Sequence, residues 1–192
     1  MFDRKVYIER RIALHERLSS GLVLLPGNDE SAANYPDNTY RFRQDSTFLY
    51  FFGLNRPKTV GLLDLDSGED ILYGDDTSLE DIIWTGPQPT LTEWAYQVGV
   101  EHTQPISHLY KRIEAAAAKG RRIHYLPPYR AETILHVGRL LGLMPDRVAA
   151  HASVELARAV VALREVKARC EIEEIEFACG IASRMHRLAM RM

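Results

Sequence analysis

The sequence predicts an α/β fold in which a mixed β-sheet is flanked by helices. Short apolar runs bracketed by glycine or proline indicate buried strands. They alternate along the chain with segments in which apolar residues recur every three or four positions, as they do in helices. The chain has 192 residues, of which 46% are hydrophobic and 26% charged, so it is long enough for one domain with a substantial core.

The first predicted helix follows Asp3, whose carboxylate can cap it, and runs to about Ser19. The helical period places Leu14 and Leu18 on its inner side, whereas Arg10 is expected on the outside. This element therefore has the pattern of a surface helix that packs one face on the sheet.

Three strands are predicted from apolar runs, at residues 21–27, 59–65 and 69–73. Asp66-Ser67-Gly68 is a turn signal, so the last two strands are expected to form a hairpin. Between the first two strands, the polar segment 28–38 is predicted to be a loop that turns at Pro36-Asp37-Asn38.

The segment 40–53, with the sequence YRFRQDSTFLYFFG, is the most informative part of the chain. Asp45 or Ser46 can accept the free N–H groups of a short helix, and Gly53 can end that helix with a positive φ. Three phenylalanines at spacings of three and four then place at least two rings on a buried face. They are Phe48, Phe51 and Phe52.

The second half of the chain continues the alternation. Residues 84–89 contain two prolines and a glycine, so they are predicted to be irregular. Helices are predicted at residues 91–98, 105–119 and 129–141, and a strand at residues 122–126. A glycine follows each of the last two helices and can end it. In the helix at 105–119, Leu109, Ile113 and Ala117 are in register on one face.

The last thirty residues predict a long amphipathic helix. Its apolar stripe has spacings of three and four and consists of Ile175, Ala178, Ala182, Met185, Ala189 and Met192. Glutamates come early and arginines late, which complements the helix dipole. Because an amphipathic helix normally buries its apolar face, we expect that the packing partner of this stripe lies outside the polypeptide. The chain is therefore expected to be a fragment, or a natural protein that has lost its second half.

Composition excludes several classes of function. The net charge of −2 lacks the basic excess of a nucleic-acid-binding surface. No apolar stretch approaches the roughly 20 residues that span a membrane, and the first residues have no apolar signal-peptide core. Cys170 and Cys179 are too far apart on the last helix for a disulfide, which favours a reducing cytosol. We expect a cytoplasmic protein without nucleic-acid or membrane partners.

The sequence shows no catalytic motif. The histidines form no His-Glu-x-x-His pattern, and there is no Cys-x-x-Cys pair, Gly-x-Ser-x-Gly elbow or phosphate-binding glycine loop. Asp64-x-Asp66-x-Gly68 lacks the remaining ligands of a calcium loop and is interpreted as a hairpin turn. His186 is interpreted as a partly buried structural histidine. We predict no catalytic residue and no metal ligand in this chain.

Four segments, in this order along the chain, resemble the N-terminal domain of the Xaa-Pro aminopeptidase (aminopeptidase P), prolidase and creatinase family. They are Arg10-Arg11-Ile12-Ala13-Leu14, the segment 40–53, Ile83-Trp84-Thr85-Gly86 and Leu163-Arg164-Glu165-Val166-Lys167. The resemblance runs from about residue 7 to the C-terminus. The sequence departs from the family at Arg41, where a proline is frequent, and at Ala168 and Arg169, where the family has Ser-Pro. These departures affect loop geometry more than fold.

The resemblance implies a division of the chain into two parts. Residues 1–163 would form the creatinase/prolidase-like N-terminal domain. Residues 164–192 would form a linker and the first helix of a metallopeptidase domain of the pita-bread fold, which is absent here. Two divalent metal ions, with manganese the first choice, are implied for that domain, and no cofactor is implied for this chain.

The function that the resemblance implies is that of a domain within a metal-dependent Xaa-Pro aminopeptidase, which removes the N-terminal residue from peptides with proline second. The domain would mediate homo-oligomer contacts and help to wall the cleft for the peptide substrate, while this chain alone would be inactive. Its other partner would be its own catalytic domain. Two alternatives remain: the same domain of a prolidase or creatinase-like hydrolase, or a non-catalytic interaction module.

Two residues match positions with substrate roles in the family. Trp84 aligns with a tryptophan that lines the substrate site, and its other interpretation is a half-buried loop anchor. Asp37 aligns with an acidic residue expected to reach an adjacent subunit's cleft, where it could hold the free amino terminus of the peptide. Its other interpretation is a surface turn. Arg41 and Arg43 either pair across an interface or brace the loop, and the sequence leaves both open.

Overall fold

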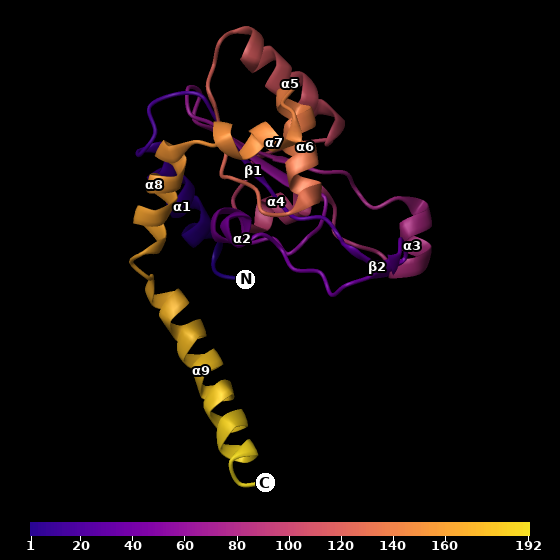
Figure 1. Ribbon diagram of the computed structural model, residues 1–192, viewed down its shortest axis with the longest axis vertical. Helices are drawn as coiled ribbons and strands as arrows, with labels where there is room; N and C mark the ends of the chain where they lie inside the picture. The colour runs from indigo at the N-terminus through magenta and orange to yellow at the C-terminus, as the bar shows by residue number, and fades with distance from the viewer.

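The computed structural model describes all 192 residues and shows a five-stranded mixed sheet with helices on both faces (Figure 1). The strand order is β6-β5-β4-β1-β7. These strands are β1 (Leu22–Pro26), β4 (Val60–Asp64), β5 (Glu69–Tyr73), β6 (His102–Gln104) and β7 (Ile123–His124). Strand β4 is antiparallel to both β1 and β5, whereas the pairs β1–β7 and β5–β6 are parallel. The predicted α/β class with a mixed sheet is confirmed.

The helices surround this sheet, and a separate two-stranded hairpin lies outside it. The helices are α1 (Arg4–His15), α2 (Ser46–Phe52), α3 (Leu79–Thr85), α4 (Leu91–Gln97), α5 (Ser107–Ala118), α6 (Ala131–Leu141), α7 (Pro145–Val148), α8 (Val154–Arg164) and α9 (Arg169–Ala189). The hairpin consists of β2 (Ala32–Tyr35) and β3 (Asn38–Thr39). None of the helices combines the length and the apolarity that crossing a bilayer requires.

The sheet separates two hydrophobic cores. Successive side chains of a strand point to opposite faces, and β1 follows this rule. Val23 and Leu25 join the core formed with α1, α2, α4 and α8, whereas Leu22 and Leu24 join the core formed with α5, α6 and α7. Figure 1 shows α5, α6 and α7 grouped at the top of the molecule, away from α1 and α2.

Helix α2 has the caps that the sequence predicts. The carboxylate of Asp45 accepts hydrogen bonds from the main-chain N–H groups of Thr47 and Phe48, and Gly53 ends the helix with a φ of 65°. All three phenylalanines of the helix are fully buried. Short helices are unstable alone, so the burial of the aromatic rings is what holds α2 in place.

Some expectations are wrong in detail. Arg10 was expected outside, but only 7% of it is exposed. Its Nη1 donates to the carbonyl oxygen of Tyr50 at 2.9 Å, and its guanidinium lies 3.9 Å from the centre of the Tyr50 ring. Helix α1 ends at His15 rather than near residue 19, and the buried alanine of α5 is Ala116 rather than Ala117.

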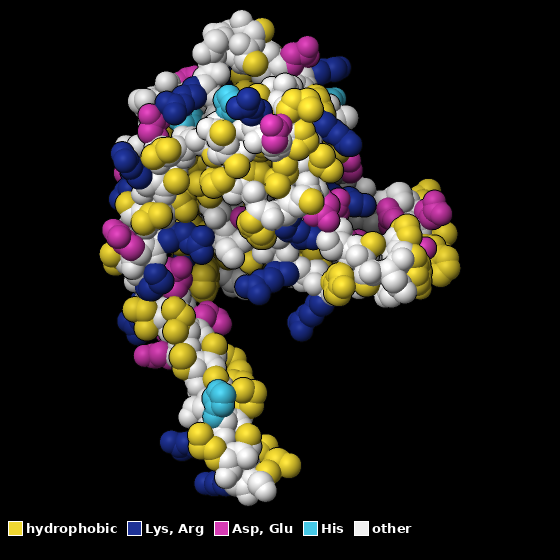
Figure 2. Space-filling model, in the orientation of Figure 1, with side chains coloured by type: hydrophobic (Ala, Val, Ile, Leu, Met, Phe, Trp, Pro, Cys, Tyr) yellow, Lys and Arg dark blue, Asp and Glu magenta, His cyan; other side chains and the backbone are white.

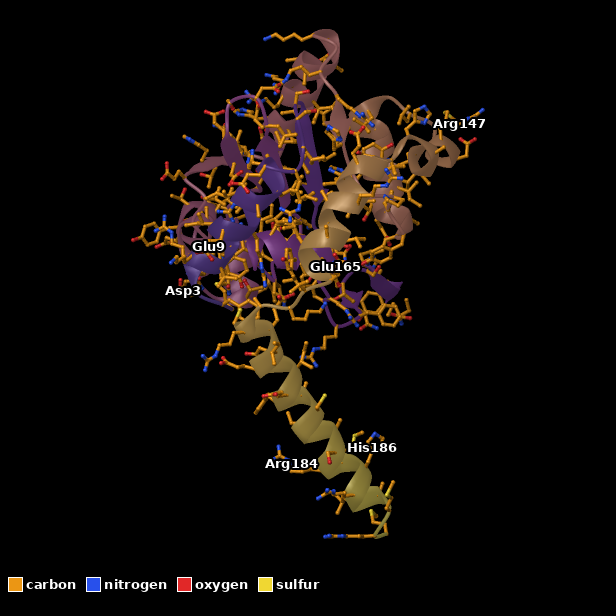
Figure 3. All side chains as sticks on the ribbon, turned by 90° about the vertical axis from the view of Figure 1, so that its left-hand side faces the viewer. Asp3, Glu9, Arg147, Glu165, Arg184 and His186 are labelled. Atoms are coloured by element: carbon orange, nitrogen blue, oxygen red, sulfur yellow. The ribbon has the colours of Figure 1, made fainter.

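Helix α9 extends away from the rest of the chain. None of its residues is buried, and the apolar stripe is open to solvent, with Met185 59% exposed. Figure 3 shows Arg184 and His186 on the part of α9 that projects beyond the body of the molecule. His186 was expected to be partly buried, but it is exposed because no other part of the chain packs on the projecting end of this helix. Both cysteines of α9 are free thiols.

Candidate functional site

Two long connections leave the same edge of the sheet. Because β1 and β5 are each antiparallel to the β4 strand between them, they run in the same direction and their carboxyl ends meet at one edge. Residues 27–45 follow β1, and residues 74–90 follow β5. Figure 1 shows β2 of the first connection and α3 of the second at the same side of the molecule, well away from the sheet. We call residues 28–43 and 75–90 the arm.

The first connection is closed at its base by the side chain of Gln44. Only 2% of this side chain is exposed. Its Oε1 accepts the main-chain N–H groups of Asn28 at 2.6 Å and Asp45 at 2.9 Å, and its Nε2 donates to the carbonyl oxygen of Arg56 at 2.7 Å. The Nδ2 of Asn28 donates in turn to the carbonyl oxygen of Arg43 at 2.9 Å. Both ends of the connection are therefore fixed to each other.

The arm carries Asp37 at the turn of a hairpin. The sequence predicted a loop over residues 28–38, but β2 and β3 pair there, with Tyr35 opposite Asn38. The predicted turn is present, since Pro36 and Asp37 occupy it. The hairpin was not predicted because its sequence is polar and does not alternate between apolar and polar residues, which is the pattern that indicates a strand. Asp37 is exposed and forms no ion pair within the chain.

The second connection forms α3, and Trp84 lies in its last turn. The prediction that residues 84–89 are irregular is wrong for Trp84 and Thr85, because the helix continues to Thr85 before Gly86 ends it with a φ of 76°. A capping box starts the helix: Ser78 and Asp81 exchange hydrogen bonds between side chain and main chain. The indole of Trp84 is 83% exposed. It is therefore not the half-buried anchor that one interpretation expected.

Two aspartates fix the base of the second connection. Oδ1 of Asp75 accepts the main-chain N–H of Ile106 at 3.1 Å, and Oδ1 of Asp76 accepts that of Leu91 at 2.6 Å. Arg56 donates to the carbonyl oxygen of Asp75. Because Arg56 also offers its own carbonyl oxygen to Gln44, one residue ties the two connections of the arm together.

A cavity of about 250 Å³ lies at the foot of the arm. Asp29 and Asp75 line it, together with Lys58 and His136. The Nε2 of His136 is buried without a hydrogen-bond partner, and burial lowers the pKa of its imidazole. No three histidine, cysteine, aspartate or glutamate side chains of the chain lie close enough together to hold a metal ion. The cavity and the arm can bind and orient groups, but the side chains present do not fit the implied two-metal centre.

The structure thus places Asp37 and Trp84 on one projecting arm, although the two residues are 47 positions apart in the sequence (84 minus 37). Sequence reasoning did not find Gln44, Asn28 or Arg56, which hold the arm. A glutamine directly before a capping aspartate is one signal that could have identified Gln44, because a buried amide there can satisfy the main chain that enters the helix.

The chain is similar to a known family of protein domains and to several longer proteins. The family described as "Aminopeptidase P, N-terminal domain" matches residues 7–124. A probable Xaa-Pro aminopeptidase of Aspergillus flavus is 27% identical over 178 residues, which are 93% of this chain and 35% of that protein. A probable Xaa-Pro aminopeptidase of Arthroderma benhamiae is 27% identical over 181 residues, with 93% and 34% covered.

Solved structures show the same fold. Aminopeptidase P from Escherichia coli in its low-pH form superposes with a TM-score of 0.62 at 24% identity, over 74% of this chain and 33% of that one. A zinc-substituted form of the E. coli enzyme in complex with product gives the same TM-score and identity, over 73% and 33%. The chain spans about a third of the length of the relatives that it matches.

Proposed function

Because the chain belongs to the family of aminopeptidase P N-terminal domains, we propose that it is the cleft-shaping and oligomer-forming domain of an Xaa-Pro aminopeptidase. The observation that carries this proposal is the arm. Two connections from one sheet edge project Asp37 and Trp84 into solvent on a base held by buried hydrogen bonds. A rigid projection with exposed recognition groups is what a wall of a neighbouring cleft requires.

The proposed role of Trp84 is to supply an apolar surface to the substrate cleft. Its exposed fraction of 83% means that it contributes little to the stability of this chain. Tryptophan has the largest apolar surface of any side chain together with one N–H donor. An indole held on a capped helix can therefore cover the proline ring of a substrate and exclude water from it.

Asp37 supplies a negative charge at the tip of the hairpin. Since no cation in the chain pairs with it, its carboxylate is free to accept a charge-assisted hydrogen bond from the ammonium group of a peptide. An aminopeptidase must recognise that group. The proposed role of Asp37 is to orient the amino terminus of the substrate, across a subunit contact where the cleft belongs to a second copy.

The bond-breaking step is assigned to residues outside this chain. The E. coli enzyme that shares the fold has been studied with zinc and product bound, and its chain is about three times as long as the matched part. We propose a catalytic domain with two divalent metal ions, manganese first, as the second partner of this chain in a cytoplasmic protein. Matches to Xaa-Pro aminopeptidases favour that activity over a prolidase, a creatinase-like hydrolase or a non-catalytic module.

The division of labour can be tested with the peptide Ala-Pro-Ala and manganese. The isolated chain is expected to show no hydrolysis, whereas the longer enzyme, in which this chain is joined to its catalytic part, is expected to release alanine. In the longer enzyme, Asp37→Asn should raise KM about tenfold, because a neutral amide binds an ammonium group more weakly than a carboxylate does. Asp146→Asn, an exposed aspartate elsewhere, serves as the control. Turnover by the isolated chain would refute the proposal.

A further inference from the structure

A short segment, residues 165–168, joins α8 to α9, and we call it the elbow. Helix α9 runs for 21 residues beyond it, and Figure 2 shows hydrophobic side chains along its projecting length. At a rise of 1.5 Å per residue α9 is about 32 Å long, so a swing of about 20° at the elbow moves its far end by about 11 Å. The place of the apolar stripe of α9 therefore depends on how firmly the elbow is held.

A side chain caps the helix on each side of the elbow. The last carbonyl groups of one helix and the first N–H groups of the next have no partner within their own helices. The hydroxyl of Tyr50, from α2, donates to the carbonyl oxygen of Leu163 in the last turn of α8 at 2.9 Å. In the first turn of α9, Oε2 of Glu171 accepts the main-chain N–H of Ala168 at 2.9 Å. The two ends that meet at the elbow are thus each fixed by a side chain.

Arg10, from α1, joins these two caps. Its guanidinium lies 3.9 Å from the centre of the Tyr50 ring, and its Nη1 donates to the carbonyl oxygen of Tyr50 at 2.9 Å. Its Nη2 lies 3.3 Å from Oε1 of Glu171. Only 8% and 18% of the side chains in this ion pair are exposed, so solvent screens it less than it screens a surface pair. One buried cation therefore links the cap of α8 to the cap of α9.

The remaining contacts at the elbow involve the same tyrosine. The guanidinium of Arg164, the last residue of α8, lies 5.6 Å from the centre of the Tyr50 ring, and its Nη1 donates to Oγ1 of Thr47 at 3.3 Å. Of the glutamates of α9, Glu171 alone forms an ion pair with another helix, since Glu173 pairs within α9 itself. The direction of α9 thus depends on few contacts, and all of them lie around Tyr50.

We propose that Tyr50, Arg10 and Glu171 form an elbow lock, which fixes the direction in which α9 leaves the domain. They are positioning residues, because they act through α9 on whatever packs against its apolar stripe. This inference rests on the proposed function in one step only: a fixed α9 also fixes the distance between the arm and the proposed catalytic part. The lock itself is a property of this chain and can be measured without any activity.

The experiment measures the distance between two spin labels by double electron–electron resonance. One label is attached to Cys179, an exposed free thiol of α9, and the other to Glu9→Cys on the exposed side of α1. Cys170→Ser removes the second native thiol. This parent chain is expected to give one narrow distribution of distances. Tyr50→Phe and Glu171→Gln are each expected to broaden the distribution at least about twofold, because each removes one contact of the lock.

Both variants are chosen to leave the fold intact. Tyr50→Phe keeps the aromatic ring, and Glu171→Gln keeps an oxygen that can accept the N–H of Ala168 while it loses the charge that pairs with Arg10. The matched controls are Tyr110→Phe, an exposed tyrosine of α5, and Glu174→Gln, an exposed glutamate of α9. Both controls are expected to keep the narrow distribution, and circular dichroism checks that Tm is unchanged in every variant.

Three results would overturn the inference. They are a parent chain that already has a broad distribution, a distribution that Tyr50→Phe and Glu171→Gln leave unchanged, and controls that broaden it as much as these two variants do. In the longer enzyme, both variants are expected to lower kcat/KM for Ala-Pro-Ala about tenfold, because they misplace the arm. The distances are measured on the chain without substrate, so failure of the lock and failure of the proposed function remain distinguishable.

Discussion

Gln44 and Asn28 are joined across the base of the arm. Oε1 of Gln44 accepts the main-chain N–H of Asn28 at 2.6 Å, although the two residues are sixteen positions apart. The connection between them contains the hairpin that carries Asp37. The position of the exposed carboxylate of Asp37 therefore depends on one buried amide.

Gln44→Ala is expected to destabilise the chain by about 1–3 kcal/mol, because it leaves buried main-chain groups without hydrogen-bond partners. Proteolysis within residues 28–43 should accelerate for the same reason. Urea denaturation and limited proteolysis measure the two effects. Gln97→Ala is the matched control, since Gln97 is exposed at the end of α4. Equal stability of the two variants would show that the amide does not hold the arm.

Arg11 offers a second test of how the chain is held together. Only 1% of it is exposed, and its guanidinium donates to Asp70 at 2.6 Å, to the Phe51 carbonyl at 2.9 Å and to two further carbonyls. An ammonium group cannot match this planar set of donors. Arg11→Lys is therefore expected to cost about 2–4 kcal/mol in urea denaturation, whereas Arg17→Lys on the exposed side should be neutral. A neutral Arg11→Lys would contradict this account.

The stability of the chain should fall in acid because of Asp64. Burial alone would raise the pKa of Asp64, but hydrogen bonds from Arg121 and from the main chain of Asp66 and Ser67 outweigh it, and the pKa lies at about 2 instead of 3.8. Because the folded pKa is the lower one, the stabilisation is present above the unfolded pKa and is lost as the pH falls from about 4 to 2.

Asp64→Asn should remove this contribution, about 2 kcal/mol at neutral pH. The difference in the free energy of unfolding between wild type and variant is expected to shrink as the pH approaches 2. Urea denaturation at several pH values measures it, with the exposed Asp146→Asn as the control. A difference that stays constant with pH would mean that Asp64 titrates normally in the folded chain.

The layers of the fold could be predicted from the sequence, because its apolar runs and helical periods are strong. Strand β6 shows the limit, because no strand was predicted at His102–Gln104. It has three residues, and so short a segment becomes a strand only beside a strand that is already formed. Strand β7 lies within the strand predicted at residues 122–126 but has only two residues. Arg10 shows another limit: its burial depends on Tyr50, forty residues away, and no local pattern reports that contact.

The candidate site could be predicted only in part. Asp37 and Trp84 were found by resemblance, and the structure shows that they share the arm. What holds the arm could not be predicted, since the hydrogen bonds of Gln44 join segments whose approach is set by the strand order. The helix around Trp84 was not predicted, because Gly86 and Pro87 directly after it indicate irregular structure. The spacing of Ser78 and Asp81 is nevertheless that of a capping box, which starts a helix.

The most direct measurement compares kcat/KM with thermal stability for Trp84→Ala in the longer enzyme, with Ala-Pro-Ala as the substrate. We predict that kcat/KM falls about tenfold or more while Tm is unchanged, because the indole is 83% exposed and contributes little to the stability of its own chain. Tyr110→Ala, an exposed aromatic residue on α5 away from the arm, should change neither quantity. An unchanged kcat/KM for Trp84→Ala, or a loss of activity that follows a lowered Tm, would contradict the claim that the arm walls the cleft.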